Sequence, residues 1–139
     1  MRKIVVIAGP TAVGKTKYAI EAARHFDGEI VSCDSMQLYK YMDIGSAKPS
    51  PEELSMARHH LIDMIDPAEP FSVSQYQKLA REAISDIFSR GKLPIVAGGT
   101  GLYLNSILYD MDFGGAPKDE EFRINLEKEA EIFGAEYVY

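Results

Sequence analysis

"GPTAVGKT", residues 9–16, is the stretch that decides the fold. The phosphate-loop pattern G-x-x-x-x-G-K-[ST] has all its fixed positions filled, by Gly9, Gly14, Lys15 and Thr16. In such a loop, backbone N–H groups and the positive end of the next helix hold an anion, while the lysine and the hydroxyl reach phosphate oxygens and Mg²⁺. An ordinary glycine-rich turn is the plain alternative, and the complete match argues against it. The loop alone does not say which phosphate compound it binds.

Segments of strand and helix character alternate on both sides of this loop. Strands are expected at 3–8, 29–33, 59–65 and 93–97, and helices at 15–25, 51–58 and 102–108, with a further helix between Ser72 and Gly91. This alternation predicts an α/β fold, a P-loop-type three-layer domain with a parallel sheet. Right-handed crossovers bring the carboxyl ends of the strands to one edge, so residues 9–16, Asp34 and Gly98–Gly101 are expected to share one crevice.

The character of the chain changes at Asp112. Residues 1–111 are predicted to form the P-loop core. Residues 112–139 are predicted to be a linker and then a highly charged helix, the beginning of a helical insertion or second domain. Because the sequence stops inside an expected element, we expect the natural chain to continue beyond Tyr139.

Composition limits the class of protein. With 46% hydrophobic residues in 139, the chain can bury one core. Its net charge of −6 argues against a broad basic face for nucleic acid, although a local basic groove stays possible. A single cysteine excludes an internal disulfide, and no apolar run is long enough to span a bilayer. We therefore expect a cytoplasmic monomer without a membrane partner.

Other residues carry weaker signals. Asp34 follows a strand, where an aspartate is as often a cap or a turn residue as a functional one. Its expected place beside a phosphate site favours either a hydrogen bond to one of the ligands of a Mg²⁺ ion or a role as general base. The glycines of "VAGGTG", residues 96–101, are most simply explained by close packing of a strand on a helix, although Thr100 could bond a ligand. The strand before them ends without an acidic residue, which argues against nucleotide hydrolysis.

Three further features are assigned structural roles. His59 and His60 are adjacent on an expected strand and so point to opposite faces, which excludes a shared metal ion and favours packing or hydrogen bonding. Cys33 is expected to be a small buried apolar residue rather than a reactive thiol. Arg123 lies in the charged helix, whose composition indicates a solvated face, and its spacing alone predicts no role.

Five motifs taken together resemble one family, the tRNA dimethylallyltransferases. In chain order they are "GPTAVGKT", "DSMQLY", "MDIGSAKP", "HHLID" and "VAGGTGLY", and the resemblance covers residues 4–109. The family transfers a five-carbon group from dimethylallyl diphosphate to the exocyclic amine of an adenine 3′-adjacent to the anticodon of tRNA. The resemblance therefore implies that the loop holds a prenyl diphosphate and not a nucleotide.

The resemblance also implies roles for single residues. The diphosphate would be bound by Gly9, Pro10, Thr11, Ala12, Val13, Gly14, Lys15 and Thr16. Lys15, with Mg²⁺ at Thr16, would stabilise the charge that develops on departing pyrophosphate. Asp34 matches the catalytic aspartate and would accept the proton of the adenine amine. The residues that would contact the tRNA are Asp34, Ser35, Met36, Gln37, Thr100 and Arg123.

The sequence departs from the family pattern in places. Val13 stands where many members have Ser, and Ser46 where many have Thr. The family continues into a second half with basic residues that grip tRNA, so we expect the isolated 139-residue piece to be inactive. Two alternatives stay open, a P-loop kinase of small molecules or nucleotides and a non-catalytic RNA-binding module. The acidic charge argues against the second.

Overall fold

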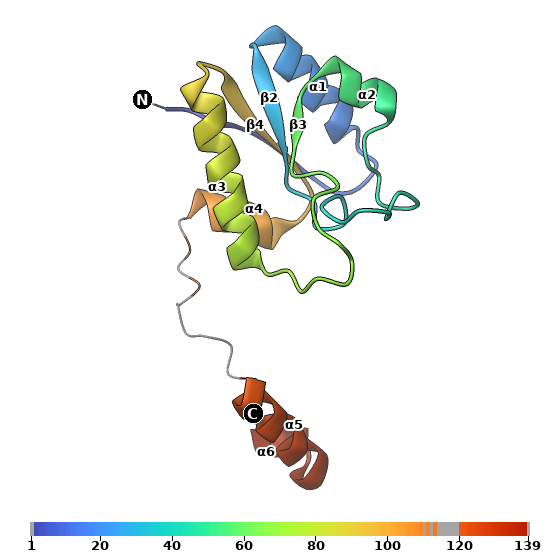
Figure 1. Cartoon of the computed structure of the whole chain (residues 1–139), viewed down its shortest axis with the longest axis vertical. Coiled ribbons are helices and arrows are strands. Elements are labelled where there is room, and N and C mark those ends of the chain that lie inside the picture. Colours follow the sequence, from blue (N-terminus) through green and yellow to red (C-terminus); the bar gives the residue numbers. More distant parts are fainter. Residues whose placement is uncertain (1, 110, 112, 114–119, 139) are drawn as a thin grey trace.

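The computed structural model of the chain describes residues 2–109, 111, 113 and 120–138. Its elements, all but the first labelled in Figure 1, are β1 (Val5–Ala8), α1 (Lys15–His25), β2 (Gly28–Ser32), α2 (Pro51–Met56), β3 (His59–His60), α3 (Val73–Ser89), β4 (Leu93–Gly98), α4 (Gly101–Leu108), α5 (Glu120–Phe133) and α6 (Ala135–Val138). The predicted order of strands and helices is thus confirmed through residue 108.

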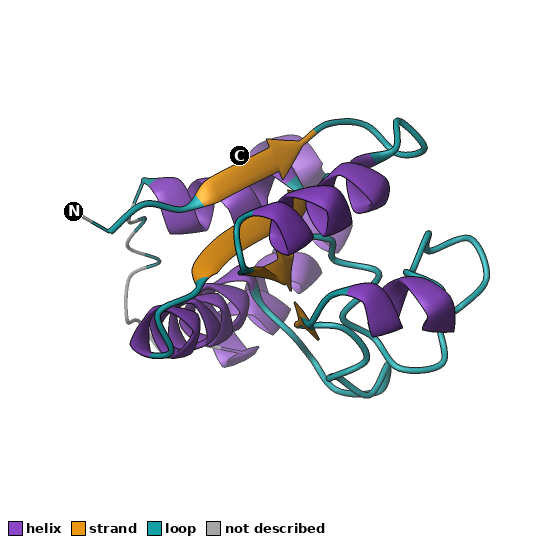
Figure 2. Cartoon of the chain, turned by 90° about the horizontal axis from the view of Figure 1, so that it is seen from above, coloured by secondary structure: helices purple, strands orange, loops and turns teal. Residues whose placement is uncertain are grey.

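The four strands form one parallel sheet in the order β1-β4-β2-β3. Neighbouring residues of a strand face opposite sides of it. Ile30 and Ile95 pack with the buried face of α1, whereas Val31 and Val96 belong to the cluster that α3 and α4 cover. Figure 2 shows the helices on both sides of the strands. The three-layer α/β prediction is confirmed.

The carboxyl ends of β2 and β4 approach each other closely. The N–H of Cys33 donates to the carbonyl of Ala97 at 2.8 Å, and a Cβ on Gly98 would overlap the backbone of Cys33. A glycine at this position therefore serves contact between two strands. The predicted explanation, packing of a strand on a helix, is wrong for Gly98.

The strand expected at 59–65 is much shorter in the structure. Only His59 and His60 pair with β2. Leu61 and Asp63 have φ values of 62° and 53°, a left-handed conformation that ends a strand. Pairing resumes as a single bridge between Ile65 and Tyr39. Of the apolar residues in this segment, Leu61 is buried as a strand residue would be, whereas Met64 is exposed.

Local signals set the helix ends. Ser50 and Ser72 each form the capping box expected from the sequence, with Glu53 and Gln75. The helix predicted to reach residue 58 ends at Met56, because Ala57 is already extended. The carbonyl of Arg58 then accepts a hydrogen bond from the N–H of Ile30 in β2. The short helix therefore leads directly into β3.

The charged C-terminal segment forms two helices, α5 and α6, which contact each other. Figure 1 shows them apart from the sheet and its flanking helices. Most of the predicted linker, residues 112 and 114–119, lies outside the described residues, so the predicted domain boundary stays a prediction. In the described part of the chain, no helix is both long and apolar enough to cross a membrane.

Candidate active site

The phosphate loop delivers an open helix N-terminus. α1 begins at Lys15 after Gly14, whose φ of 90° is a conformation that glycine adopts without cost. Within the described residues, no side chain caps this helix and its first turn carries no acidic residue. Its first amides and its positive dipole end therefore remain available to an anion.

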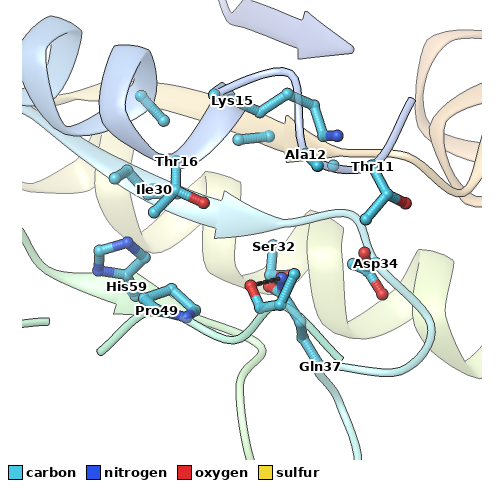
Figure 3. Close-up of a pocket in the computed structure, with 15 residues that line it drawn as sticks. Thr11, Ala12, Lys15, Thr16, Ile30, Ser32, Asp34, Gln37, Pro49 and His59 are labelled. Atoms are coloured by element: carbon cyan, nitrogen blue, oxygen red, sulfur yellow. Dashed lines mark hydrogen bonds between the residues drawn. The ribbon is translucent and has the colours of Figure 1, made fainter. Parts of the chain in front are cut away.

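A cavity of about 280 Å³ lies against this helix end. It is lined by Thr11, Ala12, Gly14, Lys15, Thr16, Ala19, Ile30, Ser32, Asp34, Gln37, Ala47, Pro49, His59, Ala97 and Gly98. Figure 3 shows Thr11 and Asp34 at one end of it and Pro49 and His59 at the other. The predicted convergence of the phosphate loop, Asp34 and the end of β4 on one crevice is confirmed.

Lys15 and Thr16, the loop residues with polar side chains expected at a phosphate, both line this cavity. Lys15 Nζ donates to the carbonyl of Pro10 and lies close to Gly99. Figure 3 shows the Thr16 hydroxyl directed into the cavity. Gly9, Pro10 and Val13 shape the loop without lining the cavity wall.

Asp34 both closes a turn and lines the cavity, so its position fits the structural and the functional explanation that its place in the sequence left open. Its Oδ1 accepts a hydrogen bond from the N–H of Met36 at 2.9 Å, so the carboxylate closes a turn. The same half-buried side chain lines the cavity. One carboxylate oxygen thus orders the backbone while the group remains in reach of a ligand.

Thr100 ties the neighbouring strand ends together. Its Oγ1 accepts from the N–H of Ser35 at 3.0 Å, and its own N–H donates to the carbonyl of Cys33 at 3.1 Å. The Thr100 side chain therefore holds the segment that follows Asp34. Met36 in that segment is exposed.

Gln37 links the end of β2 to a distant loop. Its Oε1 accepts from the hydroxyl of Ser32 at 2.9 Å, and its Nε2 donates to the carbonyl of Ala47 at 2.9 Å. Both ends of the amide are used, so the orientation of this cavity side chain is fixed.

His59 lines the cavity, a role that the sequence did not reveal. Its Nδ1 lies 2.8 Å from the carbonyl of Ala57, which can only accept, so Nδ1 carries the hydrogen. Burial lowers the pKa of His59 below its ordinary value, and the ring is therefore neutral at pH 7. His60 bonds Glu29 instead, which confirms that the two histidines do not converge.

Comparisons with known proteins agree with this geometry. A model of the IPP transferase family matches residues 37–139. The chain belongs to the IPP transferase family. It is 53% identical over 137 residues to a tRNA dimethylallyltransferase of Caldanaerobacter subterraneus subsp. tengcongensis, an alignment that covers 99% of this chain and 44% of that protein. It is 59% identical over 136 residues to one of Exiguobacterium sp., with 98% and 44% covered.

Solved structures give the same answer. A tRNA isopentenylpyrophosphate transferase from Bacillus halodurans matches with a TM-score of 0.80 and 46% identity, over 99% of this chain and 45% of that one. A eukaryotic dimethylallyltransferase that acts on tRNA matches with a TM-score of 0.80 and 34% identity, over 91% and 32%. The predicted family is confirmed. The chain spans about 44% of the length of the curated relatives it matches.

Arg123, another predicted site residue, is not among the residues that line the cavity, and the predicted metal ligand is Thr16. Arg123 lies on α5, where its Nε donates to Glu127 at 3.1 Å in an exposed pair. Among the described residues, no group of three or more His, Cys, Asp or Glu side chains could hold a metal ion. The Thr16 hydroxyl is a hard oxygen donor that lines the cavity, which suits Mg²⁺ that takes its remaining ligands from water and phosphate oxygens.

Cys33 behaves as the sequence predicts. It is buried in the cluster under α3 and α4, and burial raises the pKa of its thiol to about 11. A thiol held protonated is a poor nucleophile. Its importance to the site lies in its backbone, which binds Ala97 and Thr100.

Proposed function

We propose that this chain is the phosphate-binding part of an enzyme that transfers a dimethylallyl group from dimethylallyl diphosphate to the exocyclic amine of the adenine 3′-adjacent to the anticodon of tRNA. The observation that carries the proposal is the single cavity lined by both the phosphate loop and Asp34. The names of the relatives support the same reaction.

The diphosphate would bind at the start of α1. The amides of the phosphate loop and the Lys15 ammonium would stabilise the negative charge that grows on pyrophosphate as its bond to the allylic carbon breaks. Mg²⁺ held by Thr16 would supply further charge neutralisation when bound. Thr11 lines the same cavity and would contact the diphosphate.

Asp34 would act on the other reactant. The adenine amine forms a bond to the allylic carbon and must lose a proton, which a carboxylate within hydrogen-bonding reach can accept. The turn bond to Met36 fixes the carboxylate in the cavity before any substrate arrives. The adenine reaches such a crevice only when it leaves the loop stack of the RNA.

The tRNA would be held partly by residues beside the cavity. Ser35, Met36, Gln37 and Thr100 adjoin Asp34, and the proposed RNA contacts of this group rest on family resemblance. Arg123 is a proposed contact from α5. Since the 139-residue chain carries a net charge of −6, most contacts with the RNA phosphates would come from chain beyond this sequence. A monomeric state and a cytoplasmic location stay predictions.

A P-loop kinase is the alternative. Such an enzyme brings several arginines to the transferred phosphate. Of the described residues that line the cavity, none is an arginine. This observation favours a reaction in which no phosphoryl group moves.

The proposal is tested with the natural full-length protein, an anticodon stem-loop and labelled dimethylallyl diphosphate, with ATP turnover followed in parallel. Transfer of label to the RNA without ATP consumption is expected. ATP turnover without prenyl transfer would replace the proposal by the kinase.

A further inference from the structure

The loop of residues 41–49 supplies one wall of the cavity. Ala47 and Pro49 line it, together with the apolar residues Ala19, Ile30 and Ala97 from the sheet and α1. The phosphate-binding groups gather at the other side, on residues 11–16. A ligand with a diphosphate head and a short apolar tail matches this division, since the tail would remove apolar surface from water.

Few of the residues in the 41–49 loop make contacts that would stabilise its conformation. Tyr41, Gly45 and Ala47 have φ values of 64°, 76° and 51°. The large apolar side chains at its tip, Tyr41 and Ile44, are 80% and 100% exposed and so provide no anchor in the core. The buried hydroxyl of Ser46 has no hydrogen-bond partner within the described part of the chain. The shape of the loop therefore depends on polar contacts that one of its own residues makes.

Lys48 makes these contacts. Its side chain is only 7% exposed, and its Nζ donates to the carbonyl of Tyr39 at 2.7 Å, to Asp43 at 2.9 Å and to Asp63 at 2.5 Å. All three donors of the ammonium are used. Tyr39 precedes the loop, Asp43 lies within it, and Asp63 belongs to the turn after β3. The ammonium thus joins the cavity wall to the edge of the sheet.

The charge of Lys48 is secure. Burial by itself would lower the pKa of this ammonium, but the hydrogen bonds to Asp63 and Asp43 outweigh it and raise the pKa. The Lys48 ammonium is consequently charged at neutral pH.

We propose that Lys48 is a positioning residue that holds Ala47 and Pro49 as the wall against which the dimethylallyl group packs. This inference rests on the proposed function. Ala47 also receives the hydrogen bond from Gln37, so the wall is joined to the strand end that carries Asp34. Lys48 would therefore act on affinity for the apolar tail and leave the diphosphate contacts unchanged.

The test compares two ligands on the full-length protein by calorimetry with Mg²⁺ present, inorganic pyrophosphate and dimethylallyl diphosphate. Lys48→Met is expected to lower the affinity for dimethylallyl diphosphate by about five- to thirty-fold, the scale for losing part of the burial of a five-carbon group. The affinity for pyrophosphate should change by less than about two-fold. Lys78→Met, an exposed lysine on α3, is the matched control and should change neither.

Asp63→Asn gives a second, milder variant. Asparagine tolerates the left-handed backbone of this position, so only the charged acceptor is lost. The same selective loss, of smaller size, is expected, and it decides the question if Lys48→Met does not fold. Because a general loss of stability weakens both ligands together, the ratio of the two affinities separates positioning from folding.

The outcomes distinguish the two proposals. If the wild-type protein binds dimethylallyl diphosphate no better than pyrophosphate, the apolar tail adds no affinity and this inference fails, whereas the proposed function is decided separately by the transfer assay. If the wild type prefers dimethylallyl diphosphate and both variants keep that preference, the positioning role of Lys48 is overturned and the proposed function stands.

Discussion

The Asp34 carboxylate accepts a hydrogen bond from the N–H of Met36 at 2.9 Å while it lines the cavity of the phosphate loop. A single side chain thus shapes a turn and faces a ligand site. The two roles can be separated because asparagine keeps an oxygen that accepts the turn bond but cannot take a proton as a carboxylate does.

Asp34→Asn should lower prenyl transfer by about 10²-fold or more, the usual scale for a positioned base, with pyrophosphate affinity and melting temperature little changed. Asp34→Ala should lose the same activity and some stability as well, because the N–H of Met36 loses its partner. Transfer kinetics and thermal melts of both variants provide the measurement. An equal loss of pyrophosphate affinity in Asp34→Asn would point to a metal-binding role instead.

Gly98→Ala should destabilise the core by about 3 kcal/mol or more, since a methyl group there overlaps the backbone of Cys33 and neither strand end can move independently. Gly101→Ala is the control, because a Cβ at Gly101 has no heavy atom within 4 Å. Urea unfolding of the two variants measures the difference. Equal stability of both would mean that β2 and β4 lie farther apart than described.

Glu29 should make the fold sensitive to acid. Its side chain is 4% exposed and bonded to Arg90 and His60. These bonds, first of all those from Arg90, hold the pKa of Glu29 at about 2, below its ordinary 4.5. A folded-state pKa below the unfolded one means stability that is complete above about pH 4.5 and is lost as pH falls towards 2.

The free energy of unfolding, measured by urea between about pH 7 and about pH 3, should therefore fall less steeply with acid in Glu29→Gln than in the wild type. The variant should also be less stable at neutral pH, because Arg90 loses a charged partner. Glu21→Gln, on the exposed side of α1, should follow the wild-type curve. Parallel curves for Glu29→Gln and the wild type would show that Glu29 does not govern the acid response.

The isolated 139-residue chain should bind pyrophosphate but not transfer the prenyl group. Anion binding needs only the loop amides, Lys15 and the end of α1, whereas transfer also needs an RNA held so that its adenine meets the allylic carbon. Calorimetry and the transfer assay on this chain measure the two parts. Near-normal transfer to a stem-loop would show that no further RNA-binding region is required.

Local signals made much of the fold predictable. The bounds of α1 were predicted as residues 15–25, because the phosphate-loop pattern fixes its start and its apolar spacing fixes its length. The capping serines Ser50 and Ser72 fixed two more helix starts. The convergence of the loop, Asp34 and Gly98 followed from parallel topology alone.

The remaining features depend on contacts between distant residues. The early end of β3 reflects left-handed residues such as Asp63, which Lys48 holds from fifteen positions away. Ala47, Pro49 and His59 line the cavity, although they come from separate segments of the chain. These residues lie in the motifs "MDIGSAKP" and "HHLID", but no periodicity of the sequence shows that they meet at one cavity. Gly98 was recognised as a close-packing glycine, but its contact with the backbone of Cys33 depends on how β2 and β4 lie side by side in the assembled sheet.

The account rests on the claim that the phosphate loop holds a prenyl diphosphate. The most direct measurement is calorimetric titration of the full-length protein and its Lys15→Ala variant with dimethylallyl diphosphate and, separately, with ATP, each with Mg²⁺. We predict that the wild type binds dimethylallyl diphosphate more tightly than ATP and that Lys15→Ala weakens it at least about ten-fold, the scale of one lost charge-assisted contact. Unchanged affinity in the variant, or tighter binding of ATP by the wild type, would contradict the account.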